Sequence, residues 1–220
     1  MNRKPITQSA EQTRQALIHA GLKLFGEKGF DGTSTRALAA AANANIGSIA
    51  YHFGSKEGLR SACADFIVET MKGMASRALA SPGEPVDPEA AREQLLAALE
   101  RLVAFMVASP EAGVIVQFIL RELSHPTAAL DVIYEGVFEP THRRLCRIWA
   151  AATAEDAESE RTKIAVFTMI GQVVYFRIGR AAVLRRMGWS DIGTPEASAI
   201  ATVTRDNLAA MLASRKGERQ

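Results

Sequence analysis

The sequence is poor in the residues from which metal sites and redox centres are usually built. It has two cysteines, Cys63 and Cys146, and four histidines among 220 residues, with no CxxC pair and no cluster of cysteine and histidine. This spacing excludes the usual structural zinc sites. We expect no bound metal and two reduced, buried thiols, because free cysteine is among the most frequently buried residues. Redox sensing by either thiol is the open alternative.

Long hydrophobic runs are also absent. The longest apolar stretch covers residues 164–176 and is interrupted by Gln172, so it is shorter than the roughly 18 residues that a membrane-spanning helix needs. The first residues are polar and lack the charged and then apolar pattern of a secretion signal. We therefore expect a cytoplasmic protein that has no membrane partner.

The motifs of common enzyme classes are missing as well. The chain has no GxSxG, HExxH, GxGxxG or P-loop sequence, and these patterns place a nucleophile, zinc ligands or a phosphate-binding backbone in a defined geometry. We predict no catalytic residues and no cofactor. A helical enzyme or carrier whose first helices are only structural is the less favoured alternative.

What the sequence does contain is helical periodicity along most of its length. Leu17, Ala20, Gly21 and Leu24 recur at the spacing of one helix face, and no strand pattern is comparably strong. Pro140 should kink or divide the helix that contains it, because proline removes a backbone donor. We predict an all-α fold with helices over residues 11–28, 35–42, 46–53, 55–80, 89–108, 111–124, 127–152, 161–187 and 195–213.

Charge is distributed unevenly along the chain. Residues 1–60 hold 8 Lys or Arg against 4 Asp or Glu, whereas residues 61–220 hold 18 against 20. The first quarter is therefore basic and the remainder is close to neutral. This asymmetry predicts an anionic partner for the N-terminal quarter.

A tight turn separates the second and third predicted helices. Asn43 is one of the few residue types other than glycine that tolerates a positive φ. Asn45 is a good helix N-cap, since its side chain can accept hydrogen bonds from the amides of Gly47 or Ser48. Farther along, Ser55 can cap the fourth helix, with Glu57 in its first turn, where the helix dipole favours a carboxylate.

The short third helix has two different faces. Ile46, Ile49 and Phe53 recur at helical spacing and are predicted to face inward, which leaves small and polar side chains outward. Two helices joined by a tight turn, the second short and polar on its outer face, form the layout of a helix-turn-helix. Its recognition helix must fit a major groove about 12 Å wide, and Gly47 and Ser48 keep its N-terminal end narrow.

The stretch GFDGTSTRALAAAANANIGSIAYHFGSKEGL resembles the DNA-binding segment of TetR-family transcriptional regulators. The stretches RELSHPTAALDVIYEGVFEP and GQVVYFRIGRAAVLRRMGW are similar to the second domain of a narrower branch, the CecR-like regulators. Two positions depart from the family pattern: Asn43 stands where glycine is common, and Ala50 where an aromatic residue is frequent. Ala50 leaves the sequence preference open.

The resemblance implies a set of DNA contacts. Arg36 matches a position that can reach base edges or phosphate, and arginine can donate bidentately to guanine. Lys56 matches a phosphate-binding lysine, and the hydroxyls at the start of the second helix can serve a phosphate there. The DNA-binding residues that we predict are Thr33, Ser34, Thr35, Arg36, Asn45, Gly47, Ser48, Tyr51, His52 and Lys56.

A regulator of this kind also needs a ligand pocket and a dimer surface. Polar residues within apolar runs are good pocket candidates, because burying them without partners costs free energy. The family's dimer forms through the last two long helices. Here the apolar stripes 164, 167, 171, 174 and 200, 204, 208, 211 are compatible with that, although a stripe that faces its own core would look the same. The predicted ligand-binding residues are Phe105, Gln117, Phe118, Arg121, Tyr134, Phe138, His142, Phe167, Gln172 and Tyr175.

These observations together predict a flexible arm (residues 1–10), a helix-turn-helix DNA-binding domain (11–60), a helical ligand-binding and dimerisation domain (61–214) and a tail (215–220). We expect a homodimeric repressor that a small-molecule effector releases from double-stranded DNA carrying an inverted-repeat operator. Control by a protein partner in place of a small molecule is the main alternative.

Overall fold

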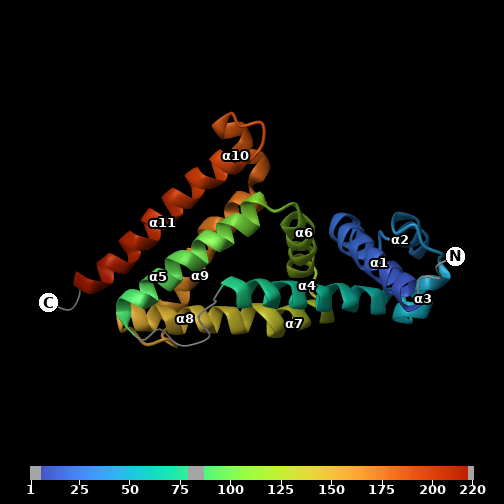
Figure 1. Cartoon of the computed structure of the whole chain (residues 1–220), viewed down its shortest axis with the longest axis horizontal. Helices are drawn as coiled ribbons and strands as arrows, with labels where there is room; N and C mark the ends of the chain where they lie inside the picture. Colours follow the sequence, from blue (N-terminus) through green and yellow to red (C-terminus); the bar gives the residue numbers. More distant parts are fainter. Residues whose placement is uncertain (1–5, 79–86, 218–220) are drawn as a thin grey trace. The chain divides into compact units, whose positions relative to one another are not determined.

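A computed structural model of the chain describes residues 6–78 and 87–217, and these residues contain helices and no strand. The all-α prediction is therefore confirmed (Figure 1). The elements are α1 (Ile6–Lys28), α2 (Thr35–Ala41), α3 (Gly47–Phe53), α4 (Lys56–Ala78), α5 (Pro88–Val103), the π-helical turn η1 (Ala104–Ala108), α6 (Pro110–Ser124), α7 (Ala128–Ile133), a second π-helical turn η2 (Tyr134–Phe138), α8 (Glu139–Thr153), α9 (Glu160–Ile178), α10 (Arg180–Met187) and α11 (Thr194–Gly217).

Helix α1 begins earlier than its apolar stripe predicts. The helix starts at Ile6, so the prediction of a flexible arm over residues 1–10 is wrong for residues 6–10, and residues 1–5 lie outside the described part. Leu17, Ile18 and Phe25 are fully buried, as the stripe requires. Gly29 follows the helix with φ +74°, which is the left-handed conformation that favours glycine after a C-terminus.

The turn before α3 follows its sequence pattern, but one residue of the inward face does not. Asn43 has φ +49°, and the Oδ1 atom of Asn45 accepts a hydrogen bond from the amide of Gly47 at 2.9 Å. Ile49 is buried and Phe53 is half-buried. Ile46, in contrast, is 51% exposed because it precedes the first helical residue and points away from the core. The prediction for Ile46 is therefore wrong.

Pro140 divides its segment as predicted, and a π-helical turn marks the division. Since proline has no N–H, it cannot donate to the carbonyl of Gly136, and the chain over residues 134–138 widens into η2 before α8 begins. A side chain at Gly136 would lie 2.7 Å from Val68 on α4. Only glycine permits this close approach of η2 to α4.

The long helix predicted for residues 161–187 is interrupted. It ends at Ile178, and α10 starts at Arg180 at an angle of 76°. A Cβ atom at Gly179 would lie 3.0 Å from the Tyr175 ring and 3.1 Å from the Tyr175 carbonyl oxygen, so the bend leaves little room for a side chain there. At the other end of the chain, α11 continues to Gly217. The predicted tail therefore begins too early, while residues 218–220 lie outside the description.

Two compact units result from the packing. One comprises residues 1–72 and 114–137, and the other comprises residues 73–113 and 138–220. The first unit thus combines the N-terminal helices with much of α6 and α7, whereas the sequence predicts a linear boundary at residue 60. The second unit has α5 at its centre, packed on α8 and α11, around the fully buried side chain of Trp149.

No single helix among the described residues is long and apolar enough to cross a membrane, although two bent helix pairs meet the length and composition criteria when each pair is taken together.

Candidate nucleic-acid interface

Ser34 and Thr33 stand side by side at the start of α2 but have different roles. The Ser34 hydroxyl accepts a hydrogen bond from the amide of Ala37 at 3.1 Å and caps the helix. Thr33 is 1% exposed, and its hydroxyl donates to the carbonyl oxygens of Gly29 (2.7 Å) and Leu24 (3.0 Å). The hydroxyl of Thr33 is therefore committed inside the protein. Its assignment as a phosphate contact does not fit the structure.

The first turn of α2 presents its polar residues outward. Ser34 and Arg36 are exposed and Thr35 is half-buried, whereas Leu38 and Ala39 on the opposite face are buried. The backbone amide of Thr35 lies at the N-terminus of a helix, where the helix dipole favours an anion. Arg36 thus extends from a rigid helix next to a site that suits a phosphate group.

The outer face of α3 carries the predicted base-reading residues. Tyr51 is 81% exposed, and its ring contacts the ring of His52 edge-on, with 4.8 Å between the centroids. Asn45 and Gly47 are exposed, and Ser48 and His52 are half-buried. Because Ile49 anchors the opposite face, the helix holds this polar surface in a fixed orientation. A large exposed aromatic side chain on a short, polar helix face is typical of a binding surface.

Lys56 has a structural role that sequence reasoning did not anticipate. Its ammonium group donates to the carbonyl oxygens of Phe30 and Thr33, both at 3.0 Å, and lies 3.9 Å from the centroid of the Phe30 ring. Two of its three N–H donors therefore join α4 to the turn between α1 and α2. The role of Lys56 as a phosphate contact stays a prediction, and one N–H donor of its ammonium group is left for it.

The N-terminus of α4 is stabilised as the sequence predicts. The Ser55 hydroxyl accepts a hydrogen bond from the amide of Gly58 at 3.1 Å. The pKa of Glu57 is held below its ordinary value, mainly by a hydrogen bond from the backbone amide of Glu57 to its carboxylate and next by one from the Ser55 side chain. Gly54, with φ +76°, ends α3 directly before this cap.

A buried ion pair that the sequence did not predict joins α4 to α6. The guanidinium of Arg60 on α4 donates to Oε1 of Glu122 on α6, and Oε2 of Glu122 accepts the hydroxyl of Thr127 at 2.6 Å. Glu122 is 1% exposed. A lone glutamate within the apolar run VIVQFILREL was the available sequence signal, because such a residue needs a partner.

Helix α6 also approaches α1 closely. A Cβ atom at Gly26 would lie 3.1 Å from the backbone nitrogen of Phe118, and one at Gly29 would lie 2.4 Å from the guanidinium of Arg121. Gln117, Phe118 and Arg121 are all predicted ligand residues. In this unit Phe118 is a core residue, and Gln117 and Arg121 contact the backbone of α1 and the residue after it.

The other predicted ligand residues do not gather in one cavity. Tyr134 is exposed and lies in the first unit, whereas the rest belong to the second. His142 stacks on Phe167, with 4.0 Å between the ring centroids, but Phe167 is 62% exposed. Among the remaining candidates, Tyr175 is exposed, while Phe105, Phe138 and Gln172 are half-buried.

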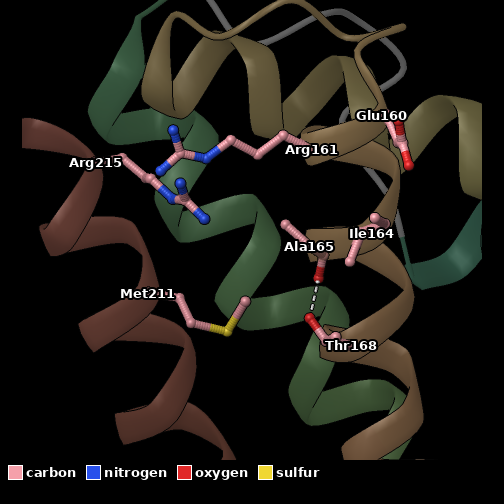
Figure 2. A pocket seen from close by; sticks show the side chains of 7 residues that line it. All are labelled: Glu160, Arg161, Ile164, Ala165, Thr168, Met211 and Arg215. Carbon is pink, nitrogen blue, oxygen red and sulfur yellow. Dashed lines mark hydrogen bonds between the residues drawn. The ribbon is translucent and has the colours of Figure 1, made fainter. Parts of the chain in front are cut away.

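A groove of about 500 Å³ lies between α9 and α11 (Figure 2). Met211 and Arg215 reach into it from α11, and Ile164 and Thr168 line it on the α9 side. None of the predicted ligand residues lines this groove, which is open to one side. Its full lining is Glu160, Arg161, Ile164, Ala165, Thr168, Met211 and Arg215.

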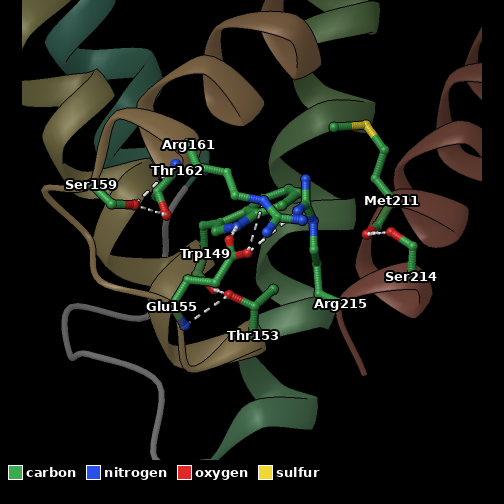
Figure 3. Close-up of polar contacts among 9 residues, drawn as sticks. All are labelled: Trp149, Thr153, Glu155, Ser159, Arg161, Thr162, Met211, Ser214 and Arg215. Atoms are coloured by element: carbon green, nitrogen blue, oxygen red, sulfur yellow. Dashed lines mark hydrogen bonds and ion pairs between the residues drawn. The ribbon is translucent and has the colours of Figure 1, made fainter. Parts of the chain in front are cut away.

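Glu155 joins the polar residues at one end of the groove (Figure 3). Its Oε1 atom lies 3.6 Å from Nε of Arg161 and 3.5 Å from Nη1 of Arg215, and its Oε2 atom accepts the Trp149 indole N–H at 2.9 Å. This carboxylate therefore links the buried Trp149, the start of α9 and the last turns of α11.

The two apolar stripes predicted for the dimer surface have different surroundings. On α11, Ile200, Thr204 and Leu208 are buried, so this stripe faces its own core. On α9, Ile164 and Phe167 are more than half exposed. Farther along α9, Tyr175 and Ile178 are also more than half exposed, as is Val203 on α11. We call Ile164, Phe167, Tyr175, Ile178 and Val203 the α9 face.

Both cysteines are buried and unpaired by disulfides, as predicted. Burial raises the pKa of the Cys63 thiol and also that of Cys146. Cys146 lies 3.6 Å from Nδ1 of His142. No group of three or more His, Cys, Asp or Glu residues suited to a metal ion occurs among the residues described.

Comparison with known proteins gives matches to both halves of the chain. Residues 17–63 match the family of bacterial regulatory proteins named tetR, and residues 91–215 match the C-terminal domain of the HTH-type transcriptional dual regulator CecR. CecR of Shigella flexneri is 38% identical over 195 residues, which cover 86% of each protein. The regulatory protein RaaS of Mycobacterium tuberculosis is 38% identical over 108 residues, which cover 48% of this chain and 49% of RaaS.

Solved structures share the fold at low sequence identity. A TetR-like transcriptional regulator from Rhodococcus sp. RHA1 has a TM-score of 0.65 and 19% identity, over 91% of this chain and 96% of that one. AibR in complex with isovaleryl coenzyme A and operator DNA has a TM-score of 0.64 and 14% identity, over 88% and 96%.

Proposed function

We propose that this chain is a homodimeric repressor that binds an inverted-repeat operator and is released from it by a small-molecule effector. The chain belongs to the TetR family of bacterial transcriptional regulators and carries the CecR type of C-terminal domain. The single observation that carries the DNA-binding part is the outer face of α3. Tyr51 stands fully outward on a helix that Ile49 anchors and that Gly47 keeps narrow at its start. This face suits a major groove.

The electrostatics of the helix-turn-helix support the same proposal. Arg36 is exposed at the first turn of α2, and the backbone amides at that helix start favour a phosphate. Phosphate contacts orient a protein on DNA, whereas base contacts select the sequence. We therefore assign phosphate binding to Ser34 and Thr35, and sequence reading to Arg36, Ser48, Tyr51 and His52.

Homodimer formation is supported by the α9 face. Its side chains are large, apolar and more than half exposed, and groups of such side chains can mark protein interfaces. We propose that a second copy covers this face and fills part of the groove between α9 and α11. A two-fold dimer would present two α3 helices to one inverted repeat.

Small-molecule control is supported by the second unit and by a structural relative. AibR, which shares the fold, is known in complex with both isovaleryl coenzyme A and operator DNA. Control by a protein partner in place of a small molecule is the second candidate. An operator complex that dissociates on adding low-molecular-weight extract favours the first candidate, and dissociation only with a protein fraction favours the second.

The DNA-binding proposal is tested by selecting preferred sites from random DNA with the purified full chain and then measuring the salt dependence of binding. A dimer that neutralises about 6–8 phosphates should give a slope of log K against log salt of roughly −5 to −7. The selected sites should be inverted repeats. A slope near zero, or sites without symmetry, would contradict the proposal.

The dimer proposal is tested by placing a charge on the α9 face. Phe167→Asp should convert the dimer to a monomer in sedimentation experiments, because burying the carboxylate in the interface is unfavourable. Leu123→Asp changes another apolar residue that is more than half exposed, on α6, and serves as the matched control. If both variants remain dimeric, the interface lies elsewhere.

A further inference from the structure

The segment GQVVYFRIGR, residues 171–180, contains hydrogen-bond donors without acceptors. Within the described part of the chain, the buried side-chain nitrogens that lack a partner include Nε2 of Gln172, Nε of Arg177 and Nη1 of Arg180. All three atoms are donors, and a buried donor without an acceptor is unfavourable. Donors of this kind would be satisfied by acceptor oxygens of a bound molecule.

Arg177 is the residue at the centre of this cluster. Its Nη2 atom donates to the carbonyl oxygen of Ser109 at 2.6 Å, at the end of η1. The guanidinium also lies against the first turn of α6, where a Cβ atom at Gly113 would be 3.3 Å from Nη2. No carboxylate among the described residues forms an ion pair with Arg177, so a backbone carbonyl is its polar contact there.

The electrostatic surroundings of Arg177 are unfavourable for an isolated cation. Burial, and then the positive charge of Arg180, lower the pKa of its guanidinium. The start of α6 adds the positive end of a helix dipole. A half-buried cation next to a second cation is costly unless a negative group compensates it.

Arg180 lies just beyond the bend at Gly179. It forms an ion pair with Asp191, an exposed carboxylate, through Nη2, while Nη1 is buried without a partner. Residues 171–190 contain Arg177, Arg180, Arg185 and Arg186 but no Asp or Glu. The bend is therefore rich in positive charge, of which Asp191 compensates that of Arg180.

We propose that Arg177 and Arg180 form an anion-binding site at the bend between α9 and α10, and that the effector binds there through a carboxylate or phosphate group. A planar guanidinium matches the oxygens of either group with paired hydrogen bonds. Gln172 is not part of this site, because its Oε1 atom accepts from Asn207 and the side chain is thereby held toward α11. The effector role rests on the proposed regulatory function, whereas anion binding does not.

The experiment is a calorimetric titration of the full-length protein with sodium hexanoate and, separately, with inorganic phosphate, at constant ionic strength. Saturable binding of hexanoate identifies the carboxylate, and saturable binding of phosphate identifies the phosphate. Arg177→Gln should raise the dissociation constant about 10- to 100-fold, as expected for the loss of a hydrogen bond to a charged group. Arg185→Gln, an exposed arginine on α10 with the same change of charge, should bind as the wild type does.

Two outcomes would overturn the site: saturable binding of neither probe to the wild type, or equal affinities in Arg177→Gln and Arg185→Gln. If Arg177→Gln does not fold, Arg180→Gln carries the comparison, because its lost partner Asp191 is exposed.

Operator binding without anion should match the wild type in every variant, since none of these residues belongs to the helix-turn-helix. Failure of the wild type to bind DNA would contradict the proposed function and leave the anion titration valid. An anion that binds but does not lower operator affinity would contradict the effector role.

Discussion

The guanidinium of Arg60 and the carboxylate of Glu122 form a buried ion pair in which Nε of Arg60 lies 2.8 Å from Oε1 of Glu122. The side chains are 15% and 2% exposed. The pair connects α4, which directly follows α3, to the last turn of α6. The same carboxylate accepts the hydroxyl of Thr127, which caps α7. One acidic residue therefore fixes three helices relative to one another.

Removing Glu122 should destabilise the protein strongly. Glu122→Leu leaves the Arg60 charge mostly buried without a partner, and we expect a loss of about 3–5 kcal/mol in the free energy of unfolding, measured by urea denaturation. The double variant Arg60→Met with Glu122→Leu should recover most of that loss. Glu11→Leu, which breaks the exposed pair with Arg14, is the control and should change stability by less than about 1 kcal/mol. Equal losses in the single and double variants would show that the ion pair is not the cause.

Arg36→Ala should weaken specific DNA binding by about 1–3 kcal/mol and relax the preference at one symmetric pair of operator positions. The reason is its exposed position at the first turn of α2, next to the helix start that favours phosphate. Site selection with both proteins measures the effect, and Lys72→Ala, an exposed lysine on α4, is the control. Identical selected sites for wild type and Arg36→Ala would make Arg36 a phosphate contact.

Lys56→Ala should have two effects, because its ammonium group serves the fold and can also serve DNA. Loss of the hydrogen bonds to Phe30 and Thr33 should lower stability by about 1.5–3 kcal/mol. Binding to all DNA sequences should weaken about equally, since phosphate contacts carry no sequence information. A changed sequence preference, measured by selection at a temperature where the variant is folded, would show that Lys56 has been assigned the wrong role.

Insertion of about 5 base pairs, half a helical turn, between the operator half-sites should abolish binding of the proposed dimer. The two recognition helices would then face opposite sides of the DNA. An operator of native length with the same central bases substituted is the matched control in a gel-shift titration. Tolerance of the insertion would mean that the two helix-turn-helix domains are not rigidly spaced.

The local features of the helix-turn-helix could be predicted from the sequence because they depend on neighbouring residues. The Asn45 cap, the positive φ of Asn43 and the Ser55 cap are formed by side chains that bond to amides two or three residues away. Helical periodicity likewise predicted that Ile49 is buried. The placement of Tyr51 on the outer face followed from the same spacing.

The hydrogen bonds of Thr33 and Lys56 within the protein could not be predicted from the sequence. Both residues have the chemistry of a phosphate contact, and both donate to backbone carbonyl oxygens within the protein. Lys56 contacts residues 23 and 26 positions earlier in the chain. A sequence pattern gives the type of hydrogen-bonding group, but only the folded chain decides which partner is nearest.

The amino-acid sequence by itself determined the helical class, the position of the helix-turn-helix and the composition of its outer face, since caps, turns and periodicity act over a few residues. Tertiary structure alone decided that the stripe on α11 is buried while Ile164 and Phe167 of the stripe on α9 remain exposed, because both stripes have a helical spacing and differ only in what packs against them. It also decided that Glu122 finds Arg60, 62 residues away. Finally, tertiary structure placed Arg177 half-buried against the carbonyl oxygen of Ser109, with the positive charge of Arg180 nearby. Ser109 lies 68 residues earlier in the chain, so no local sequence pattern predicts this contact.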